Sequence, residues 1–192
     1  MSKKYLESIK LIDGELYHLE YHQKRVESVV GRGIYRLQDM LVPPSEGLYR
    51  CRILYDAISF DVEYLSYQKR KIQTFKLIHD DFIEYSKKYA ERSPLENLLQ
   101  HRAECDDIII VKNGLLTDTS IANIAFFDGE RWLTPKTPLL QGTTRERLLD
   151  EGKIEKRDIG LQDIQSFKKI ALMNAMIDFD IIAEENQGEI IC

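Results

Sequence analysis

The chain has 192 residues, enough for one domain or for two small packed lobes. Apolar residues make up 43% of the chain and charged residues 31%, an ordinary composition for a globular protein with material for a core. The formal net charge of −5 argues against a broad nucleic-acid-binding surface, so we expect a small molecule or another protein chain as the partner.

Cysteine spacing and hydropathy bear on the compartment of the protein. Cys51, Cys105 and Cys192 are odd in number and far apart, and they show neither a disulfide framework nor a CxxC metal pair. The histidines have no metal-ligand spacing either. The N-terminal residues lack the apolar core of a signal peptide, and no stretch approaches the roughly 20 apolar residues of a membrane span. We therefore expect a cytoplasmic protein without a metal site or a membrane segment.

The first part of the chain predicts a small α+β lobe. Asp13-Gly14 readily takes the positive φ angles of a two-residue turn, so residues 7–12 and 15–19 are expected to form a hairpin. Pro43-Pro44 ends a helical pattern. In chain order, periodicity predicts helices over residues 21–30 and 34–41 and strands over residues 48–54, 58–64 and 72–78.

The rest of the chain predicts a larger lobe built on a second sheet. Residues 108–111 form a continuous apolar run, typical of a strand buried on both faces. Gly142 opens a helix over residues 143–151, and Gly152 closes it. The other expected elements are helices over residues 94–100 and 162–167 and strands around residues 115, 121–127, 132–134, 154 and 170–173. The predicted lobes are residues 1–79 and 80–192.

Four short motifs follow one another along the chain. They are Ile12-Asp-Gly14 with His22-Gln-Lys-Arg25, the segment GLLTDTSIAN from Gly114 to Asn123, Thr134-Pro135 with LQGTTR over residues 140–145, and Met173-Asn-Ala-Met176. In order and spacing they resemble the class IV aminotransferases and aminodeoxychorismate lyases, which depend on pyridoxal 5′-phosphate (PLP). The resemblance implies an α+β, two-lobed fold-type IV PLP enzyme, D-amino-acid aminotransferase-like and N-terminally shortened, with PLP held between its lobes.

The resemblance also implies a lysine that carries PLP and an acid against the pyridine nitrogen. Lys76, Lys87 and Lys88 all lie in range. Lys88 is chosen because it stands 30 residues before Asp118, near the family spacing, and because it begins a lyase-like K-x-x-x-R pattern. Asp118 takes the place of the acid, where most members carry the longer glutamate. Without the resemblance, Lys88 would belong to a solvated charge run and Asp118 to a turn or cap.

The same resemblance assigns residues to the phosphate of PLP. Thr143 and Thr144 lie at a helix start, which favours an anion, although they would serve equally well as plain N-caps. Arg25 is the cationic phosphate partner, because its planar fork suits phosphate oxygens; a lone arginine on an amphipathic helix is more often a surface residue. Asn174 donates to the phosphate or to the substrate carboxylate, or else it satisfies backbone groups at a strand end.

Together these residues predict a PLP-dependent enzyme acting on a small molecule. The Asn174-Ala175 stretch and the K-x-x-x-R pattern favour the lyase that converts 4-amino-4-deoxychorismate to 4-aminobenzoate and pyruvate, a step of folate biosynthesis, with Lys88 removing the α-proton. Two alternatives stay open. One is an aminotransferase for branched-chain or D-amino acids; the other is a PLP-fold protein that binds cofactor or a partner without turnover, which the short Asp118 favours. Family members usually form homodimers, and we expect one here.

Overall fold

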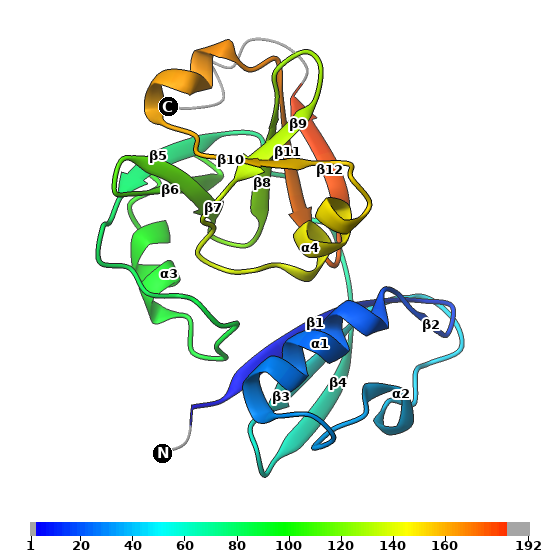
Figure 1. Cartoon of the computed structure of the whole chain (residues 1–192). Helices are drawn as coiled ribbons and strands as arrows, with labels where there is room; N and C mark the ends of the chain where they lie inside the picture. The colour runs from blue at the N-terminus through cyan, green and yellow to red at the C-terminus, as the bar shows by residue number, and fades with distance from the viewer. Residues whose placement is uncertain (1–2, 184–192) are drawn as a thin grey trace. The chain divides into compact units, whose positions relative to one another are not determined.

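The computed structural model describes residues 3–183, which divide into two compact units (Figure 1). The first unit contains the residues up to Lys69 and the later segment Lys87–Glu91. The second contains Arg70–Ser86 and the residues from Arg92 onward. The sequence instead suggests one boundary between residues 79 and 80.

The segment around Lys88 belongs to the first unit because its backbone pairs with a strand there. Leu6 N donates to Lys88 O at 2.8 Å, and Ala90 N donates to Lys4 O at 2.9 Å. These two bonds bracket an antiparallel bridge between Tyr5 and Tyr89. Hydrogen bonds between residues so distant in sequence leave no local pattern, so the return of this segment is not visible in the sequence.

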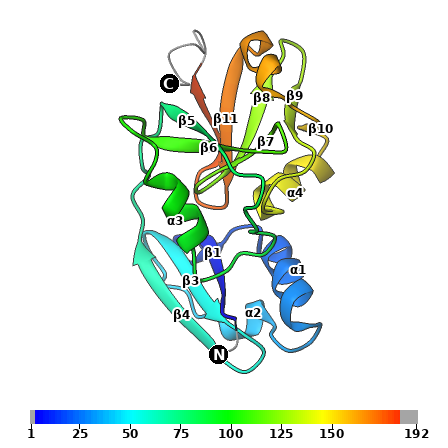
Figure 2. The same cartoon turned by 90° about the vertical axis from the view of Figure 1, so that its left-hand side faces the viewer.

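The first unit is an antiparallel sheet in the order β2-β1-β3-β4, with a helix against it (Figure 2). Its elements are β1 (Tyr5–Ile12), β2 (Glu15–Leu16), α1 (Leu19–Val30), α2 (Leu37–Met40), β3 (Leu48–Tyr55) and β4 (Phe60–Ser66). Asp13 and Gly14 have φ angles of 46° and 83°, as the predicted turn between β1 and β2 requires. Ile9 of β1, Val26 of α1 and Ile53 of β3 are fully buried in the core of this unit.

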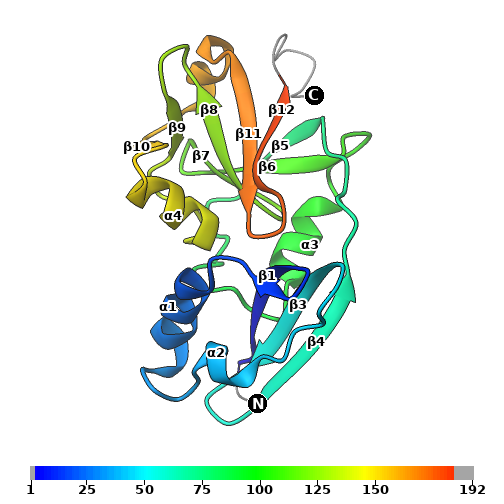
Figure 3. The same ribbon diagram turned by 90° about the vertical axis from the view of Figure 1, so that its right-hand side faces the viewer.

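The second unit is a mixed sheet in the order β10-β9-β8-β7-β6-β5, and β11 pairs with both β8 and β12. Its strands are β5 (Phe75–His79), β6 (Asp107–Lys112), β7 (Leu115–Thr119), β8 (Asn123–Phe127), β9 (Trp132–Pro135), β10 (Glu155–Arg157), β11 (Lys169–Asn174) and β12 (Asp178–Ala183). Its helices are α3 (Ser93–Leu99), α4 (Thr143–Asp150) and the 3-10 helix η1 (Leu161–Ser166). Helix α4 lies beside β11, where Leu148 packs with Met173 (Figure 3).

Most expected elements are confirmed within a few residues, including the strand at residues 108–111, which is buried along its whole length in β6. One is not: the helix expected over residues 34–41 is only the four-residue α2, because Arg36 before it is extended. In addition, strand β12 was not predicted.

Two further features concern membranes and cysteines. Within residues 3–183, no helix is both long and apolar enough to cross a membrane. Cys51 is a free thiol buried in the first unit.

Candidate active site

Asp118 is a buried carboxylate near the end of β7, with protein donors on both oxygens. Its Oδ1 accepts a hydrogen bond of 2.7 Å from Asn123 Nδ2, and its Oδ2 accepts one of 2.9 Å from Leu140 N. Asn123 is its cross-strand partner on β8, so the short connection between the two strands aligns amide and carboxylate. The carboxylate is therefore fixed in one orientation, and a carboxylate oxygen can still accept a further hydrogen bond.

Burial raises the pKa of Asp118 from its ordinary 3.8 to about 6. Hydrogen bonds from Leu140 and Asn123 and the positive charge of Arg145 act in the opposite direction. A protonated nitrogen placed beside this carboxylate would stabilise its ionised form. The electrostatic environment of Asp118 thus suits a cationic partner.

The start of helix α4 offers backbone N–H groups without a capping side chain. Gly142 is the N-cap residue, and no side chain caps the helix there. The first intrahelical bond runs from Glu146 N to Gly142 O at 2.9 Å, so the N–H groups of the preceding turn have no partner inside the helix. Thr143 and Thr144 are therefore not N-caps, which removes the plain capping interpretation, and both are buried. Such a helix start favours an anion.

Asn123 ties this helix start to Asp118. Besides its bond to the carboxylate, Asn123 Nδ2 donates to Leu140 O at 2.9 Å. A Cβ at Gly142 would come within 2.0 Å of Asn123 Oδ1, so only glycine leaves room for this amide. Asn123 is the last residue of the sequence motif that begins at Gly114. In the structure it connects the carboxylate to the loop that precedes α4.

Arg145 is a second residue that the sequence motif contained without a role. Among residues 3–183 it is the largest fully buried side chain, and its Nη2 donates to Pro135 O at 2.7 Å. Nε donates to Thr134 Oγ1 at 3.3 Å and Nη1 to Gln141 Oε1 at 3.1 Å. These acceptors are neutral, and Asp118 is the carboxylate whose charge acts on Arg145. Arg145 therefore orders the loop from β9 to α4 and adds positive charge near Asp118.

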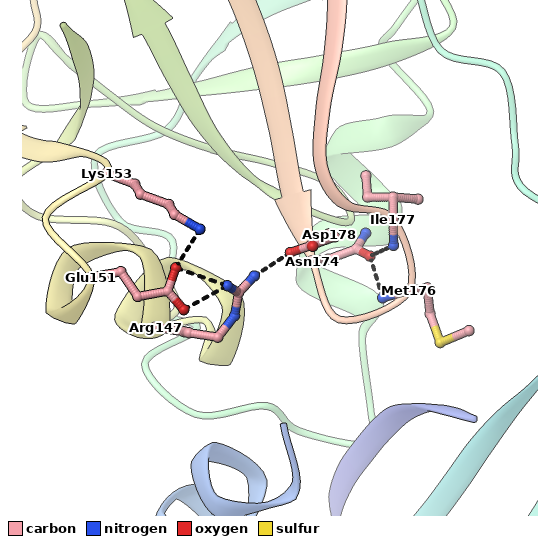
Figure 4. Close-up of polar contacts among 7 residues, drawn as sticks. All are labelled: Arg147, Glu151, Lys153, Asn174, Met176, Ile177 and Asp178. Atoms are coloured by element: carbon pink, nitrogen blue, oxygen red, sulfur yellow. Dashed lines mark hydrogen bonds and ion pairs between the residues drawn. The ribbon is translucent and has the colours of Figure 1, made fainter. Parts of the chain in front are cut away.

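Asn174, at the end of β11, closes the turn that leads into β12 (Figure 4). Its Oδ1 accepts hydrogen bonds from Met176 N at 3.0 Å and Ile177 N at 3.1 Å. Its Nδ2 donates to Ile121 O at 3.3 Å. These are the contacts expected of a strand-end amide that satisfies backbone groups. Because an amide nitrogen has two N–H donors, the bond to Ile121 still leaves one for a ligand.

Arg147 joins helix α4 to the same turn (Figure 4). Its Nη2 pairs with Asp178 Oδ1, and its Nη1 donates to Glu151 Oε1 at 2.9 Å. Lys153 Nζ also lies 2.8 Å from the other Glu151 oxygen. Arg147 thus connects helix α4, which carries Thr143 and Thr144, to the turn that carries Asn174.

In the first unit, Arg25 on α1 is paired with a carboxylate that the sequence did not single out. Arg25 Nε donates to Glu7 Oε1 at 2.7 Å, and Nη2 donates to Glu7 Oε2 at 2.5 Å. The same Oε2 lies 2.7 Å from His22 Nδ1. Glu7 shares the inward face of β1 with Ile9 and Leu11, so an acidic residue in a buried register was the signal that could have found it.

Lys88 is half-buried and lies in the same unit as Arg25. Its carbonyl accepts the bond from Leu6 N, the residue before Glu7, and its charge is one of those that lower the pKa of His22. Lys88 and Arg25 therefore form one group of expected site residues. Asp118, Thr143, Thr144 and Asn174 form a second group, in the other unit.

Comparison with known proteins identifies the family. Residues 94–183 match the family model of amino-transferase class IV. A Haemophilus influenzae protein, named only as uncharacterized, is 39% identical in a 180-residue alignment that covers 88% of this chain and 96% of that protein. A crystal structure of a "putative 4-amino-4-deoxychorismate lyase" from Haemophilus somnus is 34% identical with a TM-score of 0.80, covering 92% of this chain and 97% of that chain. The chain belongs to the class IV aminotransferase family.

This membership confirms the predicted family, its α+β fold and a PLP-dependent enzyme acting on a small molecule. A PLP-bound structure of a hypothetical aminotransferase from Mycobacterium tuberculosis has the same fold, at 17% identity and a TM-score of 0.76, over 98% of this chain and 83% of that chain. The residues of this class IV enzyme also suit PLP. Asp118 is a buried carboxylate that would suit a protonated ring nitrogen, and the uncapped start of α4 would suit a phosphate.

Proposed function

We propose that this class IV enzyme is an aminodeoxychorismate lyase, which converts 4-amino-4-deoxychorismate to 4-aminobenzoate and pyruvate. The observation that carries the proposal is the similarity to the Haemophilus somnus protein over 92% of this chain, with 34% identity. Asn174-Ala175 and the pattern from Lys88 to Arg92 support the same branch of the family. The wider fold is shared with aminotransferases, so it does not favour one reaction.

In this proposal, PLP is held by its phosphate, its ring nitrogen and a lysine. Arg25, the N–H groups at the start of α4, and Thr143 and Thr144 bind the phosphate, while Asn174 donates to the phosphate or to the substrate carboxylate. Asp118 accepts a hydrogen bond from the protonated ring nitrogen, and its hydrogen bonds from Asn123 and Leu140 hold it in place. When bound, PLP accepts electron density from the substrate α-carbon.

Lys88 supplies the base and acid of the reaction. Its amine would hold the cofactor, and once the substrate amine had displaced it, the freed neutral amine would remove the proton from the substrate α-carbon. Cleavage of the ether bond would release the three-carbon side chain as enolpyruvate, which becomes pyruvate when a proton is returned to its methylene carbon, and would leave the aromatic ring of 4-aminobenzoate. We further propose that the enzyme is cytoplasmic and acts as a homodimer, as the resemblance to the family implies; light scattering of the purified protein would give its mass.

Two measurements on the purified protein test the proposal. With PLP, a visible absorption band should form, and borohydride should fix the label on Lys88. The band should be lost in Lys88→Ala and kept in the neighbouring Lys87→Ala. With 4-amino-4-deoxychorismate, equal amounts of pyruvate and 4-aminobenzoate should appear. Transfer of the amino group from D- or branched-chain amino acids without lyase turnover would instead identify an aminotransferase. Cofactor binding without either reaction would identify a binding protein.

A further inference from the structure

Glu7 is an acidic residue at a position where the fold requires an apolar one. On β1 it alternates with Ser8 and Lys10 and shares its face with Ile9 and Leu11, and it is as fully buried as those two core residues. A carboxylate in such a place is strongly unfavourable unless it is paired and hydrogen-bonded. Its presence therefore calls for a role beyond packing.

The contacts of Glu7 fix one edge of the Arg25 guanidinium. Both carboxylate oxygens take part, at 2.7 Å from Nε and 2.5 Å from Nη2, so the plane of the guanidinium cannot rotate without breaking a hydrogen bond. The Arg25 side chain retains 12% exposure, whereas Glu7 has none. Within this pair, the arginine is the partly exposed member, and the carboxylate is fully buried.

His22 completes the cluster as a neutral donor. Burial raises the pKa of Glu7, but the charge of Arg25 and hydrogen bonds from His22 and Arg25 outweigh it and bring that pKa to about 2. An ionised carboxylate cannot donate, so the 2.7 Å contact requires a hydrogen on His22 Nδ1. Burial lowers the pKa of His22; the hydrogen bond and charge of Glu7 oppose this shift without reversing it, and the charges of Arg25 and Lys88 add to it. The neutral imidazole therefore holds Glu7 from a second side.

The same strand also positions the lysine. Leu6 N donates to Lys88 O, and Leu6 is the neighbour of Glu7 on β1. Side chains alternate along a strand, so β1 presents Glu7 to the arginine while its backbone holds the lysine segment. One short stretch of β1 thus supports both expected cofactor residues of the first unit.

We propose that Glu7 is a positioning residue for the phosphate of PLP, acting by orienting the Arg25 guanidinium. This inference rests on the proposed function, since it assumes that Arg25 binds the phosphate. Glu7 itself touches neither cofactor nor substrate. Its loss leaves the charge of Arg25 in place and removes the orientation, so binding through the phosphate weakens while binding through the ring and the lysine does not.

Binding titrations with PLP and with pyridoxal, which lacks the phosphate, test this role. In Glu7→Gln the Kd for PLP should rise about tenfold, whereas the Kd for pyridoxal should stay within about twofold. Glu63→Gln is the matched control, because Glu63 pairs with Arg52 at 2.7 Å on the same sheet but is exposed. Neither affinity should change in that variant.

A second variant keeps the test decisive if Glu7→Gln does not fold. Arg25→Lys retains the charge but cannot make the two-point contact, and it should lower PLP affinity in the same selective way. In the Arg25→Lys background, Glu7→Gln should add little to the ratio of the two Kd values. A folded Glu7→Gln protein with a lower Tm and an unchanged ratio overturns the inference and leaves Glu7 a structural ion pair. Wild-type protein that binds no PLP overturns the proposed function as well.

Discussion

The side-chain amide of Asn123 donates a 2.7 Å hydrogen bond to the carboxylate of Asp118 and a second one, of 2.9 Å, to the carbonyl of Leu140. One amide nitrogen thus joins the acid of the candidate site to the loop before α4. Because both hydrogens are used in a buried place, the replacement of Asn123 has consequences for the acid and the loop together.

Asn123→Ala should lower the free energy of unfolding by about 1–3 kcal/mol, because it leaves buried acceptors without their donor. The loss should be larger at pH 7 than at pH 4.5, since the ionised carboxylate of Asp118 depends more on a donor than the protonated form. Urea unfolding at the two pH values measures this difference. The exposed Asn97 on α3 provides the control, and Asn97→Ala should be nearly neutral at both pH values. Equal losses at the two pH values would argue against the coupling.

Gly142→Ala should destabilise the protein through a steric clash alone. The backbone of Gly142 is extended, with φ −75° and ψ 142°, which any residue adopts, but a Cβ would meet Asn123 Oδ1 at 2.0 Å. We expect a loss of about 1–3 kcal/mol. In an Asn123→Ala background the clash disappears, so the double variant should be more stable than the sum of the single losses predicts. Simple additivity in a double-mutant cycle would contradict the contact.

Asp118 should make folding less favourable as the pH rises. Its folded pKa of about 6 is above its ordinary 3.8, so the folded protein holds this proton more tightly than the unfolded chain. The resulting stabilisation is fully present below pH ~4 and is lost as the pH rises through about 6, a change of about 3 kcal/mol. Urea unfolding of the apoprotein and of Asp118→Asn at pH 4 and pH 7 isolates it, because other groups cancel in the difference.

The control for this pH dependence is Asp106. Backbone hydrogen bonds from Gln73 and Thr74 lower its pKa, so its contribution is present at neutral pH and is lost as the pH falls. Relative to wild type, the free energy of unfolding of Asp106→Asn should therefore be lower at pH 7 than at pH 4. That of Asp118→Asn, relative to wild type, should be higher at pH 7 than at pH 4. If the stability difference from wild type changed in the same direction between pH 4 and pH 7 in both variants, Asp118 would not be a buried carboxyl of raised pKa.

Local chemistry in the sequence predicted much of this fold. The Asp13-Gly14 turn, the buried strand at residues 108–111 and the helix start at Gly142 all follow from backbone preferences of a few neighbouring residues. Strand β12 was missed although Asp178 and Asp180 alternate with the apolar Phe179 and Ile181, because a strand so close to the turn at Asn174 has no separate signal.

The sequence predicted which residues belong to the candidate site better than it predicted their contacts. The sequence motifs contain Arg25 and Asp118, but the hydrogen-bond partners of these residues lie far along the chain. Glu7 is 18 residues from Arg25, and Leu140 is 22 residues from Asp118. Such contacts depend on how strands and helices pack, which no local pattern encodes. Arg145 stood in the motif without a role, because an arginine is normally a surface residue and only packing reveals that this one is buried.

Asn174 offers a test that separates its structural contacts from a ligand contact. Asn174→Asp keeps the side-chain oxygen that accepts from Met176 N and Ile177 N, but it removes the Nδ2 donor and adds a negative charge. The turn should therefore keep most of its stability, with a Tm close to wild type, whereas Asn174→Ala should lose about 1–2 kcal/mol of unfolding free energy. If Asn174 donates to the phosphate, the aspartate should weaken PLP binding at least tenfold, through lost donation and charge repulsion. If it donates to the substrate carboxylate, PLP affinity should stay unchanged while KM rises. An Asn174→Asp protein with normal PLP affinity and normal KM would leave this residue with its turn contacts alone.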